Sequence, residues 1–171
     1  MDLMDLLSKA GGGDSVSKLA STLGIGGDDA AGLIGALSPS LISGLQKQVA
    51  GDDGIDKLRG ALMGGSHSKY IDQPELMGSD ETRNDGNKIL GHLFGSKDVS
   101  RNVAAKAAKD TGLDSGMIKK ALPMIAGLAM GALSKKSDGG SKGSGLGGLL
   151  GGLVGGGGGM DDLLGLARKF F

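Results

Sequence analysis

The sequence contains no cysteine and no tryptophan, and its 171 residues include only one tyrosine and three phenylalanines. Without cysteine the chain can form no disulfide, no thiolate nucleophile and no sulfur-ligated metal site. The core must come from Leu, Ala, Ile, Met and Val, because the aromatic and β-branched residues that strands prefer are scarce. No segment alternates apolar and polar residues with a period of two. These absences exclude a substantial sheet and predict an all-α fold, a multihelical bundle.

A basic N-terminal segment and a long apolar run are also absent. The first residues, MDLMDLLSKAGGG, are acidic where a secretory signal needs basic residues. The apolar run at residues 122–133 is shorter than the roughly 20 residues that a membrane span needs, so it predicts a buried core helix. We expect a cytoplasmic protein, with export by a non-classical route left open.

Helical periodicity is present throughout and is divided by glycine and proline. We expect helices at residues 2–9, 14–23, 53–63, 80–95, 97–111 and 114–136, and a further helix that starts at Asp28 or Asp29 and that Pro39 interrupts or kinks. Asp14, Ser79 and Ser96 are the expected N-caps, Gly24 the expected C-cap, and Gly86 a weak point. Residues 64–78 are expected to form a loop.

Two parts of the chain resemble one another. TLGI precedes an apolar helix that contains Pro39, and TGLD precedes an apolar helix that contains Pro123. In each copy a capped helix leads through a glycine corner into a core helix. The repeat predicts two pseudo-repeated helical units, the first acidic and the second basic.

The composition divides the chain into four regions. These are a short amphipathic helix with a glycine linker (1–13), a helical domain (14–136), a Gly/Leu-rich low-complexity segment (137–159) and a C-terminal amphipathic helix (160–171).

The Gly/Leu-rich segment carries a helical stripe of apolar residues. Its five internal glycines each oppose a helix by about 1 kcal/mol, so residues 145–154 should become helical only on another apolar surface. Five consecutive glycines then form a joint before the last helix. The candidate assembly residues are Leu146, Leu149, Leu150, Leu153, Val154, Leu163, Leu164, Phe170 and Phe171. The alternative is that the segment stays disordered.

The net charge is zero, but the two halves differ in sign. Residues 1–85 contain 13 acidic and 7 basic side chains, a net charge of −6, and residues 86–171 contain 6 acidic and 12 basic, a net charge of +6. Two interpretations stay open, attraction between the halves within one molecule and pairing between different molecules.

Few residues are candidates for chemistry. His67 and His92 are the only histidines, and together with Tyr70 and Asp72 they form a candidate polar cluster for a small ligand or a metal. The alternative is that His67 orders a loop and His92 packs on a helix. Matches to a dinucleotide fingerprint and to a nucleophile elbow fall in the glycine tract, where no strand precedes them. We therefore expect no enzyme and no cofactor.

Residues 97–120 are basic. The candidate basic face comprises Lys97, Arg101, Lys106, Lys109, Lys119 and Lys120. No aromatic residue lies between these side chains to stack on bases, so we expect no nucleic acid partner. A solvated face, or a face that meets the acidic half, is the favoured interpretation.

Several motifs point to one family. DGNKILGHLFGSKD, the TGLD corner and LPMIAGLAMGAL, with GALSPSLISGLQ before them and DDLLGLARKFF after a glycine-rich run, resemble the bacterial YidB-like family. The resemblance covers most of residues 15–171. It implies a multihelical bundle built on a shared domain of unknown function and carries over no catalytic residues.

The sequence favours a non-enzymatic structural or interaction protein that associates with itself, into helical polymers if the pairing does not close. The alternative is a module for a small ligand or a metal, centred on His67, Tyr70, Asp72 and His92. Peripheral membrane contact through MDDLLGLARKFF is a lesser alternative.

Overall fold

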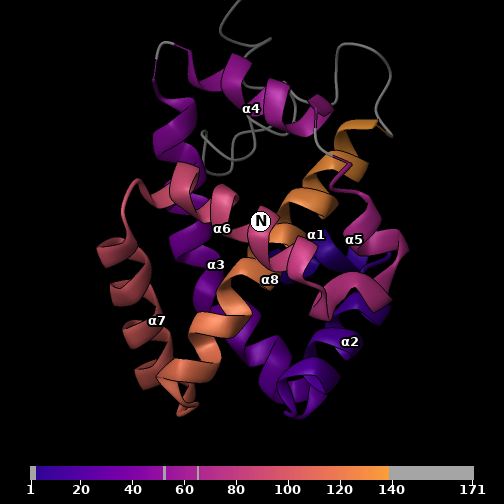
Figure 1. The fold of residues 1–171 in the computed structure, drawn as a ribbon, viewed down its shortest axis with the longest axis vertical. Helices are drawn as coiled ribbons and strands as arrows, with labels where there is room; N and C mark the ends of the chain where they lie inside the picture. The colour runs from indigo at the N-terminus through magenta and orange to yellow at the C-terminus, as the bar shows by residue number, and fades with distance from the viewer. Residues whose placement is uncertain (1–2, 52, 65, 139–171) are drawn as a thin grey trace, which may run out of the picture.

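The structure is a computed structural model that describes residues 3–51, 53–64 and 66–138. These residues form eight α-helices and one 3₁₀ helix, with no strand among them, so the prediction of an all-α multihelical bundle is confirmed (Figure 1). The elements are α1 (Leu3–Lys9), α2 (Gly13–Leu23), α3 (Gly27–Val49), α4 (Gly54–Gly64), α5 (Lys69–Asp72), η1 (Pro74–Gly78), α6 (Asp80–Phe94), α7 (Lys97–Thr111) and α8 (Ser115–Asp138). The predicted assembly residues of the C-terminal segment lie outside the described residues.

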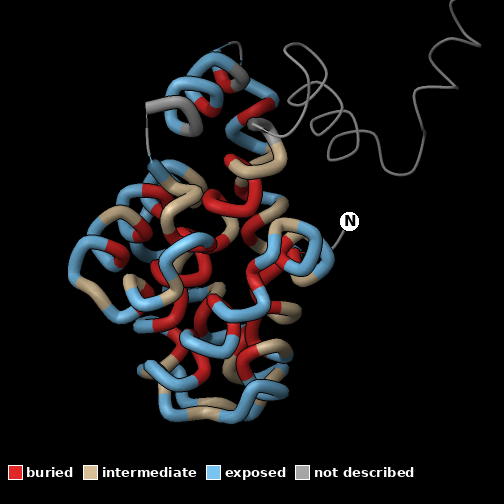
Figure 2. Tube along the Cα trace, turned by 90° about the vertical axis from the view of Figure 1, so that its right-hand side faces the viewer, coloured by how far each residue is buried: buried red, intermediate tan, exposed pale blue. Residues whose placement is uncertain are grey.

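Helix α8 forms the centre of the bundle. It contacts α1 to α7, and every residue from Ala121 to Ser134 except Ala129 is buried. Its length and composition would also suit a membrane span, but most of its apolar part is buried inside the fold. The predicted core helix is therefore confirmed. Figure 2 shows the buried residues gathered along the inside of the molecule, with exposed residues around them.

Helices α6 and α8 approach one another very closely at Gly86. A Cβ atom at this position would lie 1.9 Å from the carbonyl oxygen of Pro123. The sequence pattern marked Gly86 as a weak point of its helix. In the fold the missing side chain lets the two backbones touch.

Both proline-containing helices run on without interruption. Helix α3 includes Pro39 and α8 includes Pro123, so an interruption at Pro39, the first of the two outcomes expected from the sequence, does not occur. Next to the missing donor, the Ser38 hydroxyl donates to the carbonyl of Ile34 at 2.7 Å. Buried Leu37 and Leu41 flank the proline, and their packing offsets its local cost.

Most of the predicted caps are present. The hydroxyls of Ser79 and Ser96 accept hydrogen bonds from the amides of Thr82 and Val99, at 3.2 and 3.3 Å. Gly24 has a φ of +70°, and the amide of Ile25 donates to the Ala20 carbonyl, as in a Schellman motif. The N-cap predicted at Asp14 is wrong, because α2 begins at Gly13 and Asp14 lies in its first turn.

The segment expected to be a loop is partly helical. It contains α5 and η1, and Tyr70, Ile71 and Met77 are buried. The Ser15 hydroxyl donates to the Tyr70 carbonyl at 2.9 Å and holds α5 against α2. The segment therefore belongs to the core.

The first helix also belongs to the core. Leu3 and Leu7 of α1 are buried, and α1 packs on α3 and α8. The corners at Gly24 and Gly112 both take a left-handed glycine and lie at the same end of the molecule, the lower end in Figure 1. From this end α3 and α8 run up through the bundle.

Candidate functional site

Tyr70 of α5 is the most enclosed aromatic side chain in the structure. Its ring is fully buried, and its hydroxyl donates to a carboxylate oxygen of Asp85 on α6 at 2.5 Å. Burial, and then this hydrogen bond to Asp85, raise the pKa of Tyr70 well above its ordinary value of 10.0. The phenol is therefore held protonated and joins α5 to α6.

His67 lies next to Tyr70, with ring centroids 6.2 Å apart. Its Nδ1 is buried and has no hydrogen-bond partner among the described residues. Burial lowers the pKa of His67 below 6.5, and the nearby carboxylate of Asp85 opposes this only in part. His67 is thus a neutral, half-buried side chain at the edge of the core, and Asp85 is the partner that the sequence pattern missed.

The structure does not gather all four residues of the candidate polar cluster. Asp72 pairs with Lys135 of α8 at 2.5 Å, and His92 lies exposed on α6. Of the four residues, only His67 and Tyr70 have rings that lie close to one another. No group of three or more His, Cys, Asp or Glu side chains that could hold a metal occurs among the described residues.

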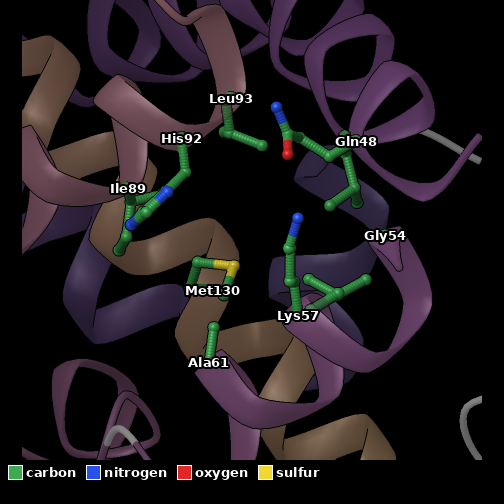
Figure 3. A pocket seen from close by; sticks show the side chains of 10 residues that line it. Gln48, Gly54, Lys57, Ala61, Ile89, His92, Leu93 and Met130 are labelled. Carbon is green, nitrogen blue, oxygen red and sulfur yellow. The ribbon is translucent and has the colours of Figure 1, made fainter. Parts of the chain in front are cut away.

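His92 instead borders an apolar cavity of about 250 Å³ that α3, α4, α6 and α8 enclose. The apolar side chains of its wall are Leu45, Leu58, Ala61, Ile89, Leu93 and Met130. Three polar side chains, those of Gln48, Lys57 and His92, complete the lining (Figure 3). Among the described lining residues, the cavity combines an apolar interior with one ammonium group, that of Lys57.

The candidate basic face is fully open to solvent. All six of its side chains are exposed, on α7 and near the start of α8. Arg101 pairs with Asp98 at 3.2 Å, and the five lysines make no ion pair with a described residue. Lys106 also borders a groove of about 380 Å³ between α3 and α7, with Lys47 opposite and Leu93, Phe94, Val99 and Val103 between them.

Several exposed acidic residues are unpaired as well, although others, such as Asp80 and Asp98, pair with a neighbouring arginine. Asp14, Asp28, Asp29 and Asp56 make no ion pair with a described residue. The bond between Lys135 and Asp72 does join the two halves of the chain. Most of the opposite charge of the halves nevertheless faces solvent.

Comparison with known proteins gives one match. No curated protein and no solved structure matches the chain. The family described as "Bacterial protein of unknown function (DUF937)" matches residues 5–136, from α1 nearly to the end of α8. This range includes the motifs from GALSPSLISGLQ to LPMIAGLAMGAL that carry the YidB-like resemblance. The chain therefore belongs to this bacterial DUF937 family, in agreement with the resemblance.

Proposed function

We propose that the protein is a non-enzymatic structural or interaction protein that associates with copies of itself. The observation that carries the proposal is that the opposite charges of its two halves stay largely unpaired within the fold. If the halves attracted one another inside one molecule, their exposed carboxylates and ammonium groups would meet in ion pairs. They point into solvent instead, where a second copy can meet them.

The charged groups are grouped in a way that suits such a contact. Asp28 and Asp29 begin α3, and Lys119 and Lys120 lie near the beginning of α8. Because both helices start at the same end of the molecule, this end carries an acidic and a basic corner (Figure 1). Two copies that pair acidic with basic corners through a two-fold axis form a closed dimer, whereas pairing without closure builds a helical filament.

Light scattering across a salt series tests the proposal. Between ionic strengths of about 0.01 and 1 M the screening length falls from about 30 to about 3 Å. We expect the average mass to exceed that of a monomer at low salt, to rise with protein concentration and to fall as salt is added. Electron microscopy of the low-salt sample distinguishes dimers from filaments. A monomer at every concentration and ionic strength would contradict self-association.

A further inference from the structure

We propose that the cavity between α3, α4, α6 and α8 binds a small amphipathic carboxylate. The apolar chain of this ligand lies among the cavity walls, and its carboxylate meets the ammonium group of Lys57. The proposal does not depend on self-association, because it concerns the opposite end of α3 and α8 from the charged corners.

The walls determine the apolar part of the ligand. Leu45, Leu58, Ile89 and Met130 come from four different helices and enclose a space of about 250 Å³. The size fits a medium-length alkyl chain, and the lining would gain from burying it.

The polar side chains determine the charge of the ligand. Lys57 reaches into the cavity with its ammonium group and the Gln48 amide lies across from it, whereas the His92 ring is directed toward Ile89 (Figure 3). None of the described lining residues is acidic, and Lys57 makes no ion pair with a described residue. A carboxylate at this place pairs with the ammonium group and accepts a hydrogen bond from the Gln48 amide. An alkyl ammonium ion of the same length would be repelled by the ammonium group of Lys57.

Other occupants fit less well. A metal ion fits poorly, because His92 is the only imidazole among the described lining residues. The other polar lining groups are the amide of Gln48 and the ammonium group of Lys57. The C-terminal segment of the chain has apolar residues of suitable size, but Arg168 and Lys169 adjoin its two phenylalanines. Docking there would bring further positive charge to Lys57.

Methyl NMR of the full-length protein, labelled at methionine methyl groups, tests the proposal with octanoate as the probe. Met130 lies on the cavity wall, whereas Met77 in η1 and Met117 in α8 do not line it. We expect octanoate to shift the Met130 signal in a saturable manner and to leave Met77 and Met117 unchanged. Octylammonium should bind at least tenfold more weakly. A Met130 signal that does not move, or equal binding of both amphiphiles, would overturn the proposal.

Two pairs of variants make the test specific. Lys57→Gln should weaken octanoate binding by about tenfold, the loss of one charge-assisted contact. Arg59→Gln, on the same helix but outside the lining, should leave it unchanged. Ala61→Phe fills the cavity and should abolish the Met130 shift, whereas Ala105→Phe on exposed α7 should retain it. An unshifted Met77 signal checks that each variant is folded. Equal losses in Lys57→Gln and Arg59→Gln would reject the assigned carboxylate contact.

Discussion

At the scale of single residues, Gly86 and Tyr70 show how α6 is fixed to the rest of the bundle. Gly86 contributes by having no side chain, because the backbone of Pro123 occupies the place where a Cβ would stand. Tyr70 contributes a fully buried ring and a hydroxyl bonded to Asp85. One contact is backbone against backbone and the other is a polar bond in the core, and both depend on an accurate fit between helices.

Replacing Gly86 by alanine should destabilise the protein strongly. The new methyl carbon would lie within 2.6 Å of three backbone atoms of Pro123, so α6 and α8 must move apart. We expect a loss of about 2 to 4 kcal/mol in the free energy of unfolding, measured with urea. Gly91→Ala on the same helix is the matched control, since nothing lies within 4 Å of its Cβ position. It should gain up to about 1 kcal/mol. Similar values for both variants would refute the close approach.

Tyr70 should remain protonated far into the alkaline range. It is the only tyrosine and there is no tryptophan, so ultraviolet absorbance follows this one phenol. Its pKa in the fold is raised above 10.0, chiefly by burial. The group therefore contributes its full stability below pH 10, and this contribution is lost as the pH rises toward the folded pKa. We expect no phenolate near pH 11 in the folded protein, and titration near pH 10 in urea. Phenolate formation at pH 10 without unfolding would contradict this.

At the scale of elements, the sequence predicts helix ends better than it predicts what lies between helices. The caps at Ser79, Ser96 and Gly24 depend on interactions within a few residues, so local patterns reveal them. The unbroken helix at Pro39 depends on packing from distant parts of the chain. The burial of α5 and η1 depends on such distant packing too, and no local pattern indicated it.

The candidate sites show the same difference between local interactions and contacts that depend on distant parts of the chain. His67 and Tyr70 are three residues apart in the sequence, and their rings lie near one another in the fold. Asp85 is 15 residues further along the chain, and its bond to Tyr70 requires α5 to fold onto α6. The cavity beside Lys57 combines residues from four helices, which cannot be inferred before the packing is known.

Helix α1 should behave as part of the core. Leu7 is 1% exposed and packs with α3 and α8, whereas Leu6 is only half-buried. Leu7→Ala should lower the free energy of unfolding by about 2 to 4 kcal/mol, and Leu6→Ala should lower it by clearly less. Urea denaturation at a salt concentration that keeps both variants monomeric measures the difference. If both substitutions were neutral, α1 would be an appendage of the domain.

At the scale of the whole molecule, the net charge is zero but the surface has separate acidic and basic regions. The acidic corner at the start of α3 and the basic corner at the start of α8 lie at one end. Under the proposed self-association, these opposite charges on separate corners attract copies of the protein to one another at low salt, and the attraction is directional. The apolar cavity is lined by α4, α6 and the later parts of α3 and α8, away from the starts of α3 and α8, so association through the charged end would leave it open.

A charge-reversal experiment tests this contact. Asp28→Lys with Asp29→Lys makes both corners basic, and Lys119→Glu with Lys120→Glu makes both corners acidic. Each double variant should lose self-association at low salt, because every corner then meets like charge in a second copy. A mixture of the two variants should associate again, since basic corners now meet acidic ones, and sedimentation velocity measures both results. Exposed Lys97→Glu with Lys106→Glu, on α7 and away from the Gly112 corner, is the control for net charge and should associate more strongly than Lys119→Glu with Lys120→Glu. If the corner variants sediment as the unmodified protein does, or if the mixture stays monomeric, this end of the molecule is not the contact surface.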